Sequence, residues 1–234
     1  MAFLRTKTVK GRRYRYLVEN YREEGKVRQR IIEYLGLEKG EDEQMVATTS
    51  TNISFDKYLS YDDGTNKNFE LVEGNLVEMP PASFLHSDII DFIADLIKAI
   101  AREQKLDIKV KTGDVGIRTG LNSSRIPDIS VIDGQIWQSY RRDQSAIIEG
   151  NLMLAVEVVS PGAEQIERDY TKKVVEYQEI GIAEYWIVDP IEERISILVL
   201  DKGSYCQTVF RGNDAISSSI FPQLKVTVQE ILSA

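Results

Sequence analysis

The chain contains a single cysteine, Cys206, among its 234 residues. One cysteine excludes an intrachain disulfide and a cysteine-based zinc site, and it favours a reducing cytoplasm as the location. No apolar run approaches the ~20 residues that a bilayer-spanning helix needs. The start of the chain also lacks the apolar core of a secretory signal. Neither a Gly-x-Ser-x-Gly motif nor a Gly-rich loop ending in Lys-Ser/Thr is present, which disfavours a serine hydrolase and a P-loop protein.

The composition is otherwise that of a globular protein, with 42% hydrophobic and 28% charged residues. The net charge of −8 is distributed unevenly along the chain. Residues 1–40 carry 11 Lys/Arg against 5 Asp/Glu, a net of +6, whereas the remaining residues carry 18 against 32, a net of −14. This division indicates a basic appendage that contacts a polyanion, carried on an acidic body. A basic hairpin that is merely solvated is the alternative.

Residues 1–36 are expected to form a small three-stranded β-meander with Gly-containing turns, because Gly tolerates positive φ. The expected strands and turns are, in order, Phe3–Val9, Lys10-Gly11, Arg12–Tyr21, Glu24-Gly25 and Lys26–Tyr34. Arg13 and Arg15 share one face of the second strand. Together with Arg28 they are the predicted contacts to DNA phosphates, although a thin sheet also needs a charged face for solubility.

This basic segment resembles the N-terminal segment of some insertion-sequence transposases. The resemblance covers about 36 residues and is carried by Tyr14–Arg30 and by Tyr34-Leu35-Gly36. It implies association with DNA and assigns no catalytic residue. Residues 37–52 are acidic and then Thr/Ser-rich, and they are expected to form a linker to a main domain over 53–234.

The main domain is expected to be α/β (α+β), with a central mixed sheet flanked by helices. Ser54 is the expected N-cap of a short helix that ends at Leu59. Isoleucines and leucines recur at helical spacing from Ile89 to Ile100, which predicts a helix over 84–103. The other expected elements are strands 69–72 and 76–79 around Glu73-Gly74-Asn75, strands at 108–118, 128–132, 152–159 and 184–188, a helix over 164–180, and closing strands 194–200 and 205–210.

Two acids lie in or beside apolar runs that are typical of buried strands. Glu157 is the only ionisable residue of Leu152–Val159, and both faces of that run are apolar, so the strand is expected to be central. Asp128 follows Pro127 at the start of another strand. Buried carboxylates are costly unless a cation meets them, and a pair on adjacent strands suits Mg²⁺ or Mn²⁺. A buried Glu–Arg pair and a Pro-Asp turn are the alternatives.

Lys173 is placed by helical geometry, at about 100° per residue. The apolar face of the expected helix comprises Ile166, Tyr170, Val174, Tyr177 and Ile180. Lys173 falls within this face, whereas Lys172 points to the opposite side. A lysine that faces the core needs a carboxylate or a phosphate, and Asp169, one turn earlier, is placed to orient it. A snorkelling lysine is the alternative.

These residues resemble the Uma-two family of restriction endonucleases, within the PD-(D/E)XK nuclease superfamily, over about residues 53–232. The residues that carry the resemblance are Phe69–Val77, Met79-Pro80-Pro81, His86, Pro127-Asp128-Ile129, Val156–Pro161, Asp169–Lys173, Tyr177 and Gly181–Pro190. The superfamily pattern has its lysine two residues after the acid, where this chain has Val159. The family moves the lysine onto the following helix, in agreement with Lys173. The resemblance implies a restriction-endonuclease-like sheet and metal-dependent cleavage by Asp128, Glu157 and Lys173.

Glu70 and His86 match further family positions near the site. Glu70 is expected to complete the metal shell or to position water, with a backbone carbonyl from Val158 as a further ligand. His86, the only histidine, is expected to contact phosphate or Glu70, or to make only a helix-start hydrogen bond. The expected protein is thus a Mg²⁺-dependent endonuclease for double-stranded DNA, acting as a homodimer. A non-catalytic DNA-binding or oligomerisation protein on the same scaffold, and a hydrolase of another phosphoester, are the alternatives.

Overall fold

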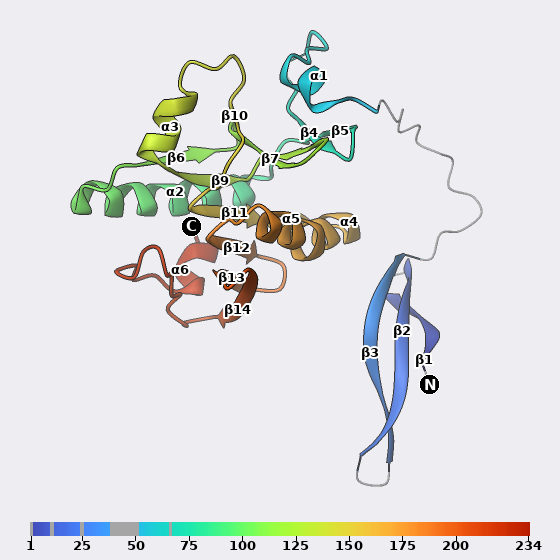
Figure 1. The fold of residues 1–234 in the computed structure, drawn as a ribbon. Coiled ribbons are helices and arrows are strands. Elements are labelled where there is room, and N and C mark those ends of the chain that lie inside the picture. The colour runs from blue at the N-terminus through green and yellow to red at the C-terminus, as the bar shows by residue number, and fades with distance from the viewer. Residues whose placement is uncertain (1, 10–11, 24–25, 38–51, 66) are drawn as a thin grey trace. The chain divides into compact units, whose positions relative to one another are not determined.

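The computed structural model describes residues 2–9, 12–23, 26–37, 52–65 and 67–234. The chain divides into two compact units, residues 1–48 and 49–234 (Figure 1). Within the described ranges, no helix is both long enough and apolar enough to cross a membrane.

The first unit is an antiparallel sheet in the order β1-β2-β3, which confirms the predicted strands. Its strands are β1 (Ala2–Val9), β2 (Arg12–Glu23) and β3 (Lys26–Leu37). The pairing of β2 with β3 shifts register twice, and such irregularities increase the local twist of a strand pair. The predicted turns and nearly all of the predicted linker over 37–52 lie outside the described residues.

The larger unit contains a six-stranded mixed sheet in the order β14-β13-β12-β11-β9-β6. Its strands are β6 (Ile108–Thr112), β9 (Ile129–Asp133), β11 (Leu154–Val158), β12 (Glu184–Asp189), β13 (Arg194–Asp201) and β14 (Ser204–Arg211). Strand β11 is parallel to β12 and antiparallel to β9, and every residue in it is buried. The predicted central position of the strand that carries Glu157 is therefore confirmed.

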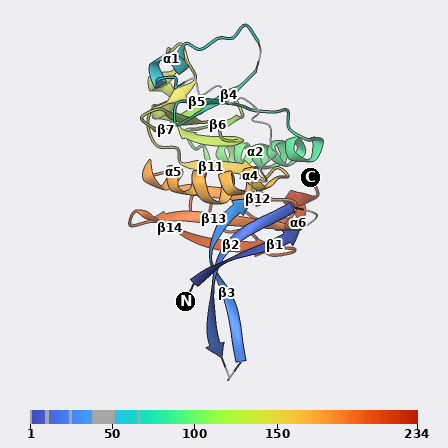
Figure 2. The same ribbon diagram turned by 90° about the vertical axis from the view of Figure 1, so that its right-hand side faces the viewer.

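Helices cover both faces of this sheet. Helix α2 (Phe84–Gln104) and the short α6 (Val228–Leu232) pack on the face that carries Leu154, Val156 and Val158. The opposite face is covered by a continuous helical segment made of α4 (Ala163–Glu167), η1 (Arg168–Lys172) and α5 (Lys173–Glu179). Figures 1 and 2 show this segment, in orange, beside β11 and β12. Side chains alternate along a strand, so Glu157 faces this segment.

A second, five-stranded sheet in the order β10-β7-β8-β4-β5 was not expected as a separate sheet. Its strands are β4 (Phe69–Val72), β5 (Asn75–Glu78), β7 (Gly116–Gly120), β8 (Ser123–Arg125) and β10 (Ile147–Ile148). The single strand predicted over 108–118 was wrong, because β6 and β7 belong to different sheets and Gly113 between them has a φ of 61°. The predicted hairpin is present, but its turn contains only Glu73 and Gly74, both at positive φ, so Asn75 begins β5.

The predicted starts of the first two helices were correct, whereas the packed face predicted for the helix over 164–180 was partly wrong. Ser54 caps α1 (Phe55–Leu59) and Ser83 caps α2. The helix predicted over 164–180 contains the π-helical turn η1, which adds a residue to the turn and so rotates α5 relative to α4. Ile166 is consequently 41% exposed rather than part of the packed face. The fully buried line is Asp169, Lys173 and Tyr177.

Candidate functional site

Four elements of the larger unit bring the predicted residues together. Asp128 immediately precedes β9, and Glu157 lies on β11, whose Val156 pairs with Ile129 of β9. Lys173 is the first residue of α5, and Glu70 lies on β4 of the second sheet. The cluster therefore forms where α5 is packed between the two sheets, in a region built from segments more than 100 residues apart in the sequence.

Glu157 is held by two donors on one of its oxygens. Its side chain is 3% exposed. Oε1 accepts a hydrogen bond from the Tyr177 hydroxyl at 2.7 Å and lies 2.8 Å from Nζ of Lys173. Burial raises the pKa of Glu157 to about 8, against the opposing effect of Lys173. The partners are a lysine and a tyrosine rather than the arginine of the alternative interpretation.

Lys173 lies between three carboxylates and does not reach solvent. Its side chain is 2% exposed, so it does not snorkel. Besides Glu157, its Nζ lies 3.4 Å from Oε1 of Glu70 and 3.8 Å from Oδ1 of Asp169. Burial alone would lower the pKa of Lys173, but the carboxylates, Glu157 foremost, hold that pKa above its usual value. The group is thus an ammonium in the native state.

Asp128 is the more accessible of the two strand acids, with a side chain that is 16% exposed. Its Oδ2 accepts a hydrogen bond from the Val158 N–H at 2.7 Å and lies 3.2 Å from Nε2 of His86. The other ring nitrogen of His86 lies 3.4 Å from Oγ of Ser160. In the described residues His86 therefore contacts Asp128 rather than Glu70. Its backbone N–H also donates to the capping Ser83, which is the helix-start bond of the alternative interpretation.

Glu70 is buried, and protein groups contact both of its oxygens. Oε1 accepts from the Ile126 N–H at 3.1 Å and faces Lys173, while Oε2 accepts from Nη1 of Arg125 at 2.9 Å. Burial raises the pKa of Glu70, but Lys173 and Arg125 together lower it below the usual range. The carboxylate is therefore ionised and oriented by the protein.

Sequence reasoning missed Arg125 and Glu176 as partners of the site. Arg125 is 2% exposed and donates Nε and Nη2 to the two oxygens of Glu176, at 2.7 and 2.5 Å. Glu176 also accepts from the Thr119 hydroxyl at 2.8 Å. The sequence did contain one indication of this pair. Arg125 is a cation that precedes the buried strand beginning after Asp128, and a buried arginine requires an acidic partner. Nothing in the sequence identified which acid that was.

The carboxylates leave oxygens for a hard cation. Among the described residues, the contacts of Asp128 all use Oδ2 and those of Glu157 all use Oε1, so Oδ1 and Oε2 have no protein partner. No group of three or more His, Cys, Asp or Glu side chains in these residues is arranged to hold a metal ion. Two carboxylates completed by water are a typical donor set for Mg²⁺, whereas zinc prefers His and Cys. The residues present therefore fit Mg²⁺ or Mn²⁺.

The charge of the cluster is consistent with that fit. It contains three cations and five acids, so it carries −2 when all are ionised. The acids are Glu70, Asp128, Glu157, Asp169 and Glu176, and the cations are Arg125, Arg168 and Lys173. One divalent cation would balance this excess, and a proton on Glu157 partly balances it when no cation is bound.

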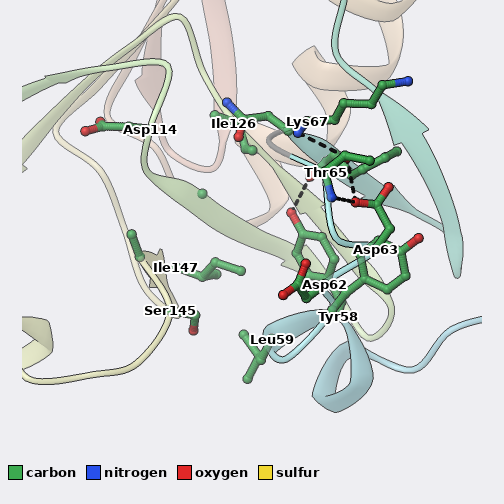
Figure 3. Close-up of a pocket in the computed structure, with 15 residues that line it drawn as sticks. Tyr58, Leu59, Asp62, Asp63, Thr65, Lys67, Asp114, Ile126, Ser145 and Ile147 are labelled. Atoms are coloured by element: carbon green, nitrogen blue, oxygen red, sulfur yellow. Dashed lines mark hydrogen bonds between the residues drawn. The ribbon is translucent and has the colours of Figure 1, made fainter.

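A separate cavity of about 220 Å³ lies beside the loop that precedes β4 (Figure 3). Two of its acidic residues, Asp62 and Asp63, accept hydrogen bonds from the backbone N–H groups of Gly64 and Thr65 in the same loop, at 2.7 and 2.9 Å. None of Asp128, Glu157 and Lys173 lines it. The cavity is therefore distinct from the cluster of acids around Lys173.

The two mixed sheets with flanking helices form a restriction-endonuclease-like nuclease fold. Residues 55–229 match the model of the Uma2 (Uma-two) family, described as "Putative restriction endonuclease", and the chain belongs to this family. Residues 4–51 match the N-terminal domain of IS1634 family transposases. Both resemblances noted in the sequence are thereby confirmed.

Among the solved structures with a similar fold is one that matches most of this chain. It is described as a "putative nuclease belonging to DUF820" from Anabaena variabilis, with a TM-score of 0.64 and 20% identity. The match covers 77% of this chain and 98% of that one. No similar sequence was found among curated proteins.

Proposed function

We propose that the protein is a divalent-metal-dependent endonuclease that hydrolyses phosphodiester bonds in double-stranded DNA. The observation that carries the proposal is the Lys173 ammonium, buried 2.8 Å from Glu157 of the central strand, with Asp128 at the start of the adjacent strand. Family membership as a nuclease agrees with this chemistry. A merely structural ion pair would not require an excess of acids over cations.

Each side chain has a distinct role in this proposal. Asp128 and Glu157 would hold the cation through Oδ1 and Oε2. A divalent cation held there would supply two effects, a lower pKa for a coordinated water and neutralisation of charge on the phosphate. Lys173 stabilises the attacking hydroxide or the phosphate oxygens electrostatically. The side chains that orient these groups are His86 for Asp128, Tyr177 for Glu157, and Glu70 and Asp169 for Lys173.

Supercoiled plasmid incubated with Mg²⁺ or Mn²⁺ tests this function. The wild-type protein is expected to produce nicked or linear DNA, and chelation should stop the reaction. Asp128→Asn should lower the cleavage rate about 100-fold or more, because a ligand and its charge are lost. Asp143→Asn, at an exposed position, is the matched control and should cleave at the wild-type rate. DNA binding without metal-dependent cleavage would instead support the non-catalytic alternative.

The first unit is proposed to hold the DNA backbone through Arg13, Arg15 and Arg28. Replacing all three with Ala should weaken DNA binding at low salt. The logarithm of the association constant decreases linearly with the logarithm of the salt concentration. The steepness of this decrease should be smaller by roughly 0.9 for each phosphate that the variant no longer neutralises. Electrophoretic mobility shifts over a salt series measure it.

A matched triple variant at exposed positions of the larger unit, Arg141→Ala, Arg142→Ala and Lys202→Ala, should leave that slope unchanged. An unchanged slope in the Arg13, Arg15 and Arg28 variant would contradict the proposed interaction. The next candidate is then a groove of about 520 Å³ between the end of α2 and β6, lined by Lys98, Arg102, Lys105 and Lys109. Charge reversal at Lys105 and Lys109 would test that groove with the same assay.

We further propose that the protein acts as a homodimer in the cytoplasm, because cleavage of a duplex requires a site for each strand. Light scattering coupled to size-exclusion chromatography measures the assembly state. A monomer that makes only single-strand nicks would contradict the dimer and leave the chemistry of the site in place.

A further inference from the structure

We propose that Arg125 is a positioning residue that sets the place of Lys173, acting through Glu70 on one side and Glu176 on the other. The inference rests on the proposed function in that Lys173 is taken as the group that acts on the phosphate. It assigns a role to two residues, Arg125 and Glu176, that no part of the sequence pattern marked as functional.

A continuous chain of opposite charges joins Lys173, Glu70, Arg125 and Glu176, in that order. Arg125 donates Nη1 to Glu70 at 2.9 Å, and the other oxygen of Glu70 lies 3.4 Å from Nζ of Lys173. Arg125 also donates Nε and Nη2 to Glu176, in a bidentate pair. Every member except Glu176 is almost fully buried, so water does not replace these interactions.

Both ends of the chain of charges meet on one helix. Lys173 and Glu176 are three residues apart in α5, which is about one turn, so they lie on neighbouring parts of its surface. Arg125 is the last residue of β8, and Glu70 lies on the adjacent strand β4. The guanidinium therefore ties α5 to the second sheet one turn beyond Lys173. Its planar fork fixes direction as well as distance, which a lysine in its place would not do.

Charge gives a second reason for the role. Lys173 lies closer to Glu157, at 2.8 Å, than to Glu70, at 3.4 Å. Arg125 supplies the positive charge that Glu70 needs, so Lys173 remains beside Glu157. Without Arg125, the buried Glu70 carboxylate would have Lys173 as its main cation and would draw the ammonium away from Glu157.

Stability alone does not account for this arrangement. Buried ion pairs contribute little to stability relative to apolar side chains of similar volume. The chain of charges instead fixes the position of the Lys173 ammonium. Such positioning affects turnover, because displacement of a reacting group by about 1 Å lowers reaction rates by about 100-fold. The expected effect of losing Arg125 is therefore on turnover, with substrate binding largely retained.

Steady-state cleavage by Arg125→Met, Arg125→Lys and Glu176→Gln tests the role. Arg125→Met should lower kcat about 10- to 100-fold with KM nearly unchanged, and Arg125→Lys should recover only part of that loss. Glu176→Gln should lower kcat several-fold. The double variant Arg125→Met/Glu176→Gln should be no slower than Arg125→Met alone, because the two residues act as one unit.

Arg118→Met is the matched control. Arg118 lies on β7, next to β8, and its ion pair with Glu149 is on the surface, so its loss should leave kcat unchanged. All rates are taken well below the unfolding temperature of each variant. A folded Arg125→Met protein with wild-type kcat would overturn the proposal, as would full additivity with Glu176→Gln. If Arg125→Met does not fold, Arg125→Lys and Glu176→Gln still decide the question by the same criteria.

A crystal structure of Arg125→Met, or of Glu176→Gln where the first does not fold, separates this inference from the proposed function. Lys173 is expected to shift toward Glu70 and away from Glu157. An unmoved ammonium overturns the positioning role even if the wild-type protein cleaves DNA. If the wild-type protein cleaves nothing, the proposed function fails, whereas the measured position of Lys173 still tests the geometry.

Discussion

Replacing Lys173 with methionine is expected to lower DNA cleavage by about 100- to 1000-fold. The ammonium is the cation of the cluster that contacts Glu157, and electrostatic stabilisation in a buried site contributes about 100- to 1000-fold for each donor removed. Methionine retains most of the side-chain length and volume without the charge. DNA affinity should stay close to the wild-type value, because a side chain that is only 2% exposed contributes little to an encounter with DNA.

Lys172→Met is the matched control, because Lys172 is the preceding residue, carries the same charge and is exposed. It should cleave at the wild-type rate. Removing one partner of a buried ion pair destabilises proteins by about 3–5 kcal/mol, so the unfolding midpoint and circular dichroism of Lys173→Met must be measured alongside its activity. Full cleavage by folded Lys173→Met would exclude the catalytic role of this residue.

Local sequence patterns could predict those residues of the site whose charged side chain lies on an otherwise apolar strand or helix face. Glu157 is an acid in an otherwise apolar strand, and Lys173 is a cation on the packed side of a helix. Both conflicts are visible within a window of about ten residues. The structure places the two groups 2.8 Å apart, which local patterns could not show because they say nothing about which elements meet.

The ion-pair partners of Glu70 and Arg125 could not be predicted from the sequence. Arg125 lies 55 residues from Glu70 and 51 from Glu176 in the chain. No periodicity links such positions, since tertiary packing alone brings them together. Strands β8 and β10 are three and two residues long, too short for an alternating pattern to be seen. The second sheet, on which Glu70 and Arg125 lie, therefore remained unrecognised.

The helix with Lys173 shows a different limit. An ideal period of 3.6 residues correctly placed Lys173 and Tyr177 inward but also placed Ile166 there, which is exposed. The π turn at Arg168–Lys172 accounts for the difference, and such turns are frequent at functional sites. It also brings Asp169 into line with Lys173 and Tyr177 on the buried side. A departure from regular helix geometry thus helps to assemble the cluster.

The stability of the metal-free protein is expected to depend on pH through Glu157. Its pKa is about 8 in the folded protein and about 4.5 in the unfolded chain. The folded state therefore retains a proton that the unfolded chain loses between these values. The contribution to stability is complete below pH 4.5 and is lost as pH rises through 8, at up to about 1.4 kcal/mol per pH unit.

Glu157→Gln should remove this dependence. The free energy of unfolding of the variant, relative to wild type, should rise by a few kcal/mol between pH 4.5 and 8. Urea unfolding at a series of pH values measures it, with the exposed Glu164→Gln as the matched control. Mg²⁺ at pH 8 should stabilise the wild-type protein and the control but not Glu157→Gln, because only the ionised acid binds the cation. Parallel pH profiles for wild type and Glu157→Gln would show that burial does not perturb this carboxyl group. Equal stabilisation of the wild-type protein and Glu157→Gln by Mg²⁺ would show that Glu157 does not bind the cation.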